Sequence, residues 1–297
     1  MSLPAAISSV KVVEAVGKHT GTVIFLHGLG DQGTSFVPMA HMLGRQFPNL
    51  KFILPSAKSI PITMNSGYKM PGWFDVPTLD NLTTNSKRID DEPGLMKSVT
   101  SLEQLIAQEV KNAQIPEESI VIGGFSQGSV ISILTGITTT KKLGGVVALS
   151  GWVPLNHKIA EIASPHAKDL AVFWGHGTDD QVVKFSFGMK SIELLQSVPQ
   201  INLPLLPAGQ SYGKPGLTFR KYDGMPHSLA AEEIDDLTAW LQGITFDVWT
   251  ASHRKGLANG ESSGTGSTMG HQTFPSANQV MSYHSPRARL SRMTRED

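Results

Sequence analysis

Residues 119–128 read Ser-Ile-Val-Ile-Gly-Gly-Phe-Ser-Gln-Gly, and this stretch decides the fold. An apolar β-branched run ends at two glycines, Ser126 follows with Gly124 and Gly128 as its second neighbours, and a helix-like segment begins directly afterwards. This strand–turn–helix context is typical of a G-x-S-x-G nucleophile elbow. So sharp a turn presses its flanking residues against neighbouring backbone, where only glycine fits. Because the same pattern also arises by chance in glycine-rich turns, the interpretation depends on partners elsewhere in the chain.

The composition limits the kind of protein this can be. The chain has 297 residues, 40% hydrophobic and 17% charged, which suits one large α/β domain or two small ones. Basic and acidic residues number 25 each, so no net charge favours nucleic acid or an anionic membrane as a partner. The absence of cysteine excludes disulfides, thiolate metal sites and a cysteine nucleophile. No secretory signal and no run of about 18 apolar residues is present, so we expect a soluble intracellular protein without membrane insertion.

Apolar runs and helical spacings alternate along the chain, which predicts an α/β fold. We expect a mostly parallel central sheet with helices on both faces. Strands are expected at residues 22–26, 51–54, 119–123, 146–150, 170–174 and 217–222, and helices at 36–47, 95–110, 127–137 and 230–241. The connection 55–93 is long enough to suggest a functional loop. Its Trp73 and Phe74 are expected to pack onto the core, the alternative being that they border a substrate groove.

The turn after the first predicted strand reads His-Gly-Leu-Gly-Asp-Gln-Gly over residues 27–33 and has two interpretations. It matches the G-x-G-x-x-G of dinucleotide-binding folds, but these need an acidic residue at the end of the next strand. Here that strand runs into Pro55-Ser56-Ala57. The favoured interpretation is an oxyanion loop that presents the backbone N–H of Leu29 to the nucleophile, with His27 bracing the loop.

The later strand ends supply the partners that a serine nucleophile needs. The run Gly-His-Gly-Thr-Asp-Asp at 175–180 follows one predicted strand, and His227 follows the last. The chain order serine, acid, histidine is that of α/β-hydrolases, which makes Asp180 or Asp179 the candidate acid and His227 the candidate base. The N–H of Gln127, directly after Ser126, is the second expected oxyanion donor, at the start of a helix whose dipole favours negative charge.

The remaining histidines give no reason to expect a metal. His157, His166 and His176 lack a carboxylate or histidine partner at metal-binding spacing, and surface or loop-bracing roles suffice for them. We therefore expect neither a metal nor another cofactor.

The composition changes near residue 249. We predict a catalytic domain over residues 1–249 and a disordered tail over 250–297, where Ser, Gly, Thr, Asn and Gln dominate and apolar residues are isolated.

Five motifs in one order resemble a known family. They are residues 25–31 (Phe-Leu-His-Gly-Leu-Gly-Asp), 71–75 (Pro-Gly-Trp-Phe-Asp), 123–128 (Gly-Gly-Phe-Ser-Gln-Gly), 148–152 (Ala-Leu-Ser-Gly-Trp) and 224–227 (Gly-Met-Pro-His). Together they closely resemble the acyl-protein thioesterases, also called lysophospholipase-type carboxylesterases, over roughly residues 5–243. The resemblance implies a single α/β-hydrolase domain in a cytoplasmic enzyme, with the nucleus as a further compartment, that removes palmitoyl groups from protein cysteines and also acts on lysophospholipids and small esters.

The resemblance also assigns residues. It places the nucleophile on Ser126, the acid on Asp180, the base on His227 and the oxyanion donors on Leu29 and Gln127. The family's proline after the acid is Gln181 here, which leaves Asp179 as an alternative acid. The acyl groove that the resemblance implies is apolar and is formed by Leu79, Trp152, Val182 and Phe187.

Two other hypotheses are compatible with the sequence. One is a small-molecule carboxylesterase, and the other is a catalytically silent hydrolase-fold protein that binds a lipid. The oligomeric state and the particular acylated substrates are not specified by any pattern in the chain.

Overall fold

The computed structural model describes residues 2–78, 90–207, 213–244 and 246, and the predicted tail lies outside them. Within these residues one sheet of seven strands has the order β1-β3-β2-β6-β7-β8-β9. All neighbouring strands pair in parallel except β1, which is antiparallel to β3. The strands are β1 (Ile7–Val13), β2 (Gly21–Leu26), β3 (Leu50–Ala57), β6 (Ile120–Phe125), β7 (Gly145–Leu149), β8 (Ala171–Gly177) and β9 (Gly216–Tyr222).

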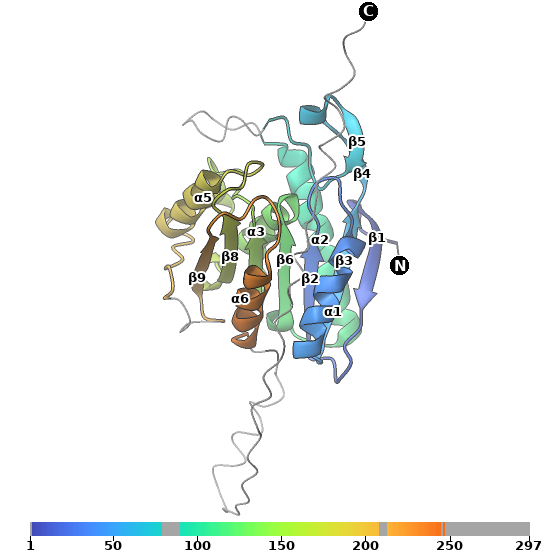
Figure 1. Cartoon of the computed structure of the whole chain (residues 1–297). Helices are drawn as coiled ribbons and strands as arrows, with labels where there is room; N and C mark the ends of the chain where they lie inside the picture. The colour runs from blue at the N-terminus through green and yellow to red at the C-terminus, as the bar shows by residue number, and fades with distance from the viewer. Residues whose placement is uncertain (1, 79–89, 208–212, 245, 247–297) are drawn as a thin grey trace, which may run out of the picture.

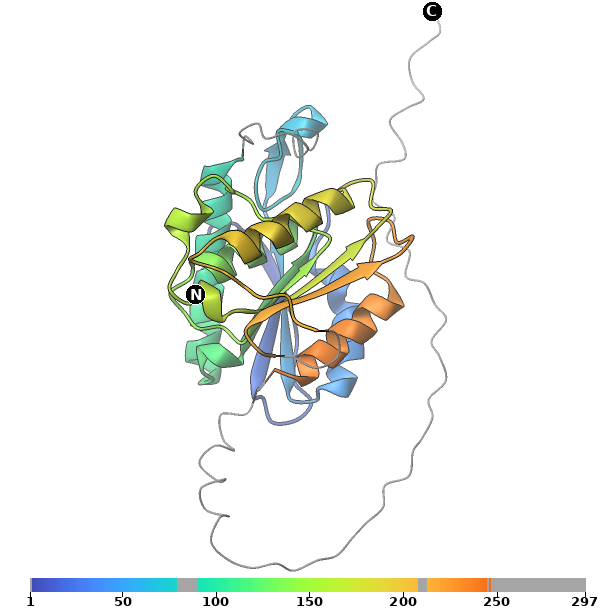
Figure 2. The ribbon, with the colours of Figure 1, turned by 90° about the vertical axis from the view of Figure 1, so that its left-hand side faces the viewer.

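Helices cover both faces of this sheet (Figure 1). On one face lie α1 (Val37–Gln46) and α6 (Ala231–Gln242), and on the other lie α2 (Glu92–Ala113), α3 (Gln127–Thr138) and α5 (Phe185–Ser197). Figure 2 shows α5 and the orange α6 on opposite sides of the strands. The short α4 (Ile159–Ile162) and the 3-10 helices η1 (Gly33–Phe36), η2 (Thr63–Asn65), η4 (Glu117–Ser119) and η5 (Ala167–Asp169) complete the connections.

The central strands explain why the sheet needs helices on both sides. Every residue of β2 is buried, and its side chains alternate between two apolar clusters. Ile24 and Leu26 pack with α2, α3 and α5, whereas Val23 and Phe25 pack with α1 and α6. A parallel strand that is apolar on both faces is stable only between two layers of helices, so the predicted fold class is confirmed.

The connection 55–93 contains regular structure that its composition did not predict. Strand β3 continues through residues 55–57, and β4 (Ser59–Ile62) and β5 (Tyr68–Pro71) form an antiparallel hairpin outside the main sheet. The expectation of one long irregular loop is therefore wrong for this part. Trp73 and Phe74 follow the hairpin and are 3% and 2% exposed, as predicted for side chains that anchor the segment to the core.

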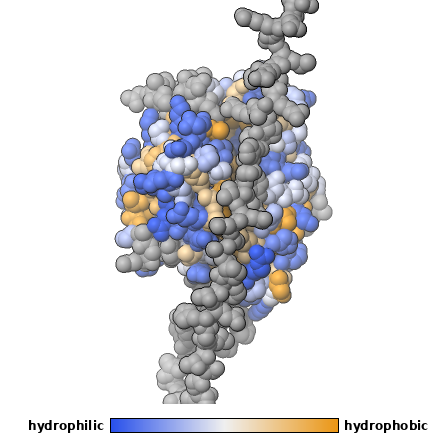
Figure 3. All heavy atoms as spheres, in the orientation of Figure 1, coloured by the Kyte–Doolittle hydropathy of each residue, from blue (hydrophilic) through white to orange (hydrophobic). Residues whose placement is uncertain are grey.

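The surface is mixed in character. On the face shown in Figure 3, hydrophilic and hydrophobic residues are interspersed. Among the described residues no helix is both long and apolar enough to span a membrane.

Candidate active site

Ser126 lies at the sharp turn between β6 and α3. Its backbone is strained, with φ 53° and ψ −118°, in a region that costs a non-glycine residue about 1–3 kcal/mol. Surrounding hydrogen bonds hold it there, because the Ser126 N–H donates to the Leu149 carbonyl at 2.8 Å and its carbonyl accepts from the N–H and hydroxyl of Ser129. This geometry is the nucleophile elbow that the sequence predicted.

Steric contacts explain the two glycines beside the elbow. A Cβ on Gly124 would lie 2.4 Å from the carbonyl carbon of Gly128, and one on Gly128 would lie 2.2 Å from the carbonyl oxygen of Leu26. Both obstacles are backbone atoms that no side-chain movement can relieve. The explanation of the G-x-S-x-G spacing from the sequence is thereby confirmed.

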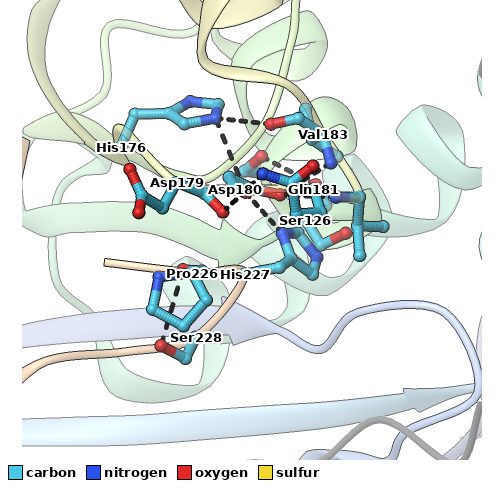
Figure 4. Close-up of polar contacts among 11 residues, drawn as sticks. Ser126, His176, Asp179, Asp180, Gln181, Val183, Pro226, His227 and Ser228 are labelled. Carbon is cyan, nitrogen blue, oxygen red and sulfur yellow. Dashed lines mark hydrogen bonds and ion pairs between the residues drawn. The ribbon is translucent and has the colours of Figure 1, made fainter. Parts of the chain in front are cut away.

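Asp180 and His227 meet at the carboxyl ends of β8 and β9 (Figure 4). Oδ2 of Asp180 lies 2.7 Å from Nδ1 of His227, while Oδ1 accepts from the amides of Val182 and Val183 at 2.9 and 2.8 Å. A carboxylate oxygen accepts a hydrogen bond from Nδ1–H, which leaves Nε2 as the basic nitrogen. Asp180 is buried, whereas Asp179 is exposed, so the geometry favours Asp180 as the acid.

The imidazole of His227 lies next to the elbow. Its ring packs on Phe125, the residue before Ser126, with ring centroids 4.7 Å apart, and Figure 4 shows Ser126 beside it. Within the described part of the chain Ser126 Oγ makes no hydrogen bond. A serine hydroxyl turns about its Cα–Cβ bond, and contacts of this kind often tighten only when substrate binds.

His176 lies at this site in a loop-bracing role, one of the two roles expected for it from the sequence. Its side chain is fully buried on β8, its Nε2–H donates to the Val183 carbonyl at 2.8 Å, and the same nitrogen lies 3.6 Å from Oδ2 of Asp180. Burial lowers the pKa of His176 below its usual value, against the opposing effects of Val183 and Asp180. Its position four residues before the acid, on the same strand end, was the available signal.

The loop after β2 lies against the elbow. A Cβ on Gly28 would be 3.4 Å from Cβ of Ser126, so the residue before Leu29 lies against Ser126. His27 braces this loop, because Nε2 accepts from the Ala57 N–H at 2.9 Å and Nδ1–H donates to the Gly28 carbonyl at 2.6 Å. Burial lowers the pKa of His27, which suits a neutral ring that must accept one of these bonds. The bracing role predicted for His27 is confirmed.

Gln127, the first residue of α3, has its backbone N–H at the helix terminus beside Ser126. The start of a helix leaves its first N–H groups without intrahelical partners, and they favour negative charge. The N–H groups of Leu29 and Gln127 therefore remain our candidates for binding an oxyanion.

The proposed groove residues have different surroundings. Trp152 and Phe187 are buried, at 3% and 4% exposed, and Val182 is half-buried beside the same apolar cluster. Trp152 also makes an edge contact with Phe74, with centroids 6.2 Å apart. Leu79 lies outside the described residues.

A mostly parallel sheet flanked by helices, with a strained serine after β6 and an Asp–His pair after β8 and β9, defines an α/β-hydrolase. The model of the phospholipase/carboxylesterase family matches residues 8–244, and the chain belongs to this family.

Individual relatives agree with this assignment. Acyl-protein thioesterase 1 of Cryptococcus neoformans var. neoformans serotype D is 52% identical over 223 residues, which cover 75% of this chain and 92% of the relative. Acyl-protein thioesterase 1 of Mycosarcoma maydis is 39% identical over 236 residues, which cover 76% and 92%. The crystal structure of Zea mays acyl-protein thioesterase 2 is similar with a TM-score of 0.65 and 27% identity, covering 79% of this chain and 97% of that one.

Proposed function

We propose that this protein is a serine hydrolase that cleaves the thioester bond of palmitoylated protein cysteines, with Ser126, His227 and Asp180 as its catalytic residues. The observation that carries the proposal is the 2.7 Å hydrogen bond that orients His227 beside the nucleophile elbow. The substrate class is supported by the relatives, which are named acyl-protein thioesterases.

The first half of the reaction forms an acyl-enzyme. Ser126 Oγ attacks the thioester carbonyl carbon while Nε2 of His227 takes the hydroxyl proton. The carbonyl oxygen becomes negative and is bound by the N–H groups of Leu29 and Gln127, each such donor lowering the barrier by about 3 kcal/mol. When the carbon–sulfur bond breaks, the leaving cysteine sulfur receives the proton from His227.

The second half releases the fatty acid. Water gives a proton to His227 and attacks the acyl-serine carbonyl, and the bond to Ser126 Oγ breaks as the oxygen takes the proton back. Asp180 remains an anion throughout and stabilises the imidazolium that forms in each half. No step requires a metal or another cofactor.

The acyl chain is proposed to bind among Trp152, Val182 and Phe187. Each methylene removed from water there would contribute about 0.8 kcal/mol. Lysophospholipids, which carry a comparable chain on an ester, are the proposed second substrates. The cytoplasm, and in addition the nucleus, is the proposed place of action.

The test compares a palmitoyl-cysteine peptide with a short-chain acetate ester, using wild type and Ser126→Ala. We expect higher kcat/KM for the palmitoyl peptide and loss of both activities in the variant. Preference for the acetate ester would instead indicate a small-molecule carboxylesterase. Failure of the folded wild type to react with a fluorophosphonate would indicate a lipid-binding protein without catalysis.

A further inference from the structure

Residues 71–75, here called the strap, run from the end of β5 past the nucleophile elbow, and Gln127 binds them with its side chain. Oε1 of Gln127 accepts from the Trp73 N–H at 2.8 Å, and Nε2 donates to the Phe74 carbonyl at 2.6 Å. All three residues are buried, at 1–3% exposed. Both polar ends of one amide side chain are therefore used to fix the strap to the first turn of α3.

The strap is also hydrogen-bonded to the loop that carries Leu29, the other candidate oxyanion donor. The indole N–H of Trp73 donates to the His27 carbonyl at 2.9 Å, and the Gly30 N–H donates to the Pro71 carbonyl at 2.8 Å. His27 precedes Leu29 in the chain and Gly30 follows it, so the two bonds hold the loop on either side of Leu29. The strap is thus hydrogen-bonded both to the loop that carries Leu29 and to the first residue of α3, Gln127.

The outer side of the strap borders a cleft and is also held by hydrogen bonds. The Gly72 N–H donates to the Lys58 carbonyl at 3.1 Å, the Ser98 hydroxyl donates to the Trp73 carbonyl, and the Asp75 N–H donates to Oδ2 of Asp91 at 2.8 Å. A cleft of about 310 Å³ lies against Gly72, Trp73, Phe74 and Asp75, between the β4–β5 hairpin and the start of α2. Atoms that border a cleft lose packing contacts on that side. The hydrogen bonds to Gln127, His27 and Gly30 are the ones that join the strap to the segments carrying the candidate oxyanion donors.

We propose that Trp73 and the side chain of Gln127 are positioning residues that hold the Leu29 and Gln127 N–H groups at the separation required to bind one oxyanion. The inference rests on the proposed function, since it concerns how that site stabilises its transition state. Oxyanion donors are effective because they are fixed before the reaction begins. A displacement of about 1 Å can cost roughly 100-fold in rate, so a loosened strap lowers kcat and leaves ground-state binding of the acyl chain largely intact.

Two variants test the proposal. Trp73→Phe keeps an aromatic ring but removes the bond to His27, and Gln127→Met keeps the length of the side chain but removes both bonds to the strap. For each we expect kcat on a palmitoyl-cysteine peptide to fall about 10- to 100-fold with KM within about threefold. Because both substitutions loosen the same element, the fold-loss of kcat in the double variant should be smaller than the product of the two single fold-losses.

Two measurements distinguish the loss of oxyanion positioning from a loss of folded protein. Rates are expressed per active site titrated with a fluorophosphonate, so that unfolded molecules are not counted. Affinity for a boronic acid that mimics the tetrahedral oxyanion should fall by the same factor as kcat/KM.

Trp174→Phe is the matched control. Trp174 is also fully buried, but within the described residues its indole N–H has no hydrogen-bond partner. The Trp174→Phe variant should lose thermal stability, as Trp73→Phe does, but its kcat should stay within about twofold of wild type. Equal kcat losses in the two variants, or an unchanged affinity of Trp73→Phe for the boronic acid, would overturn the proposal. If wild type hydrolyses only acetate esters, the substrate assignment fails, but the strap is still tested on that ester.

Discussion

Oδ2 of Asp180 lies 3.6 Å from Nε2 of His176, and neither side chain is exposed, at 0% each. The same Nε2 donates to the Val183 carbonyl, and the amides of Val182 and Val183 donate back to Oδ1 of Asp180. His176 therefore closes the turn that holds the acid, although it does not contact His227 through a hydrogen bond in the described residues.

Replacement of His176 by leucine should leave the buried Val183 carbonyl without a donor. An unsatisfied buried acceptor costs about 1–3 kcal/mol of stability, and a looser Asp180 should lower kcat about tenfold through misorientation of the base. His176→Gln carries an amide N–H that can reach the same carbonyl, and it should recover much of both losses. Urea unfolding and kcat measurements check this, and a leucine variant with full activity would show that the turn is held without His176.

Asp180 and Asp179 should behave differently when each becomes asparagine. Asp180→Asn places an amide opposite Nδ1 of His227 and favours the wrong tautomer, so kcat should fall about 10⁴-fold. Asp179 is exposed and its Oδ1 accepts from the neighbouring Thr178 hydroxyl at 3.2 Å. Asp179→Asn should change kcat less than about threefold, in keeping with surface substitutions generally. The reverse ranking would reassign the acid.

Gly128→Ala should prevent the elbow from forming correctly. The added Cβ would meet the Leu26 carbonyl oxygen at 2.2 Å, and forcing atoms into a filled site costs about 1–3 kcal/mol or more. We expect loss of stability together with loss of fluorophosphonate labelling at Ser126.

Gly44→Ala provides the comparison within an ordinary helix. Gly44 lies in α1, and its nearest obstacle to a Cβ is 3.8 Å away. Alanine there should stabilise the protein by about 0.5–1 kcal/mol without affecting activity. A stable, active Gly128→Ala variant would contradict the steric account of the motif.

Glu233 makes stability depend on pH. The side chain is buried in the first turn of α6, and burial raises its pKa from 4.5 to about 8, the backbone at Ala230 opposing and Asp236 adding to the shift. Between those pH values the folded protein holds a proton that the unfolded chain releases. The free energy of unfolding contributed by this group therefore falls as pH rises through the window, and levels off above the folded pKa.

Glu233→Gln should flatten this dependence. One proton corresponds to a slope of about 1.4 kcal/mol per pH unit, which the variant should lack in urea unfolding experiments across the window. Glu232→Gln changes an exposed neighbour in the same turn and should retain the wild-type slope. Identical slopes in all three proteins would show that Glu233 is ionised in the fold.

The parts of the fold that could be predicted from sequence are those whose signal is local. The central strands are apolar on both faces, and the elbow combines a strand end, a turn and a helix start within ten residues. Strand β1 was missed because its burial pattern is mixed and it is defined by antiparallel pairing with β3, about forty to fifty residues away. The β4–β5 hairpin was missed because proline and glycine in its sequence also suit an irregular loop.

The same distinction between local and long-range signals applies to the candidate active site. Ser126, Asp180 and His227 could be proposed from the sequence because each follows a strand within a few residues and their order in the chain is that of α/β-hydrolases. The bonds from Gln127 to the strap depend on an approach between distant segments, since Gln127 and Trp73 are 54 residues apart. No periodicity or motif encodes contacts of that kind.

Strand β9 lies at the end of the sheet order and pairs with β8, and His227 follows it. The ribosome therefore delivers the proposed base after every strand of the sheet, so under the proposed mechanism a nascent chain whose elbow has already formed is still inactive. Premature termination between Ser126 and His227 would therefore yield a polypeptide that retains the proposed nucleophile but lacks the proposed base.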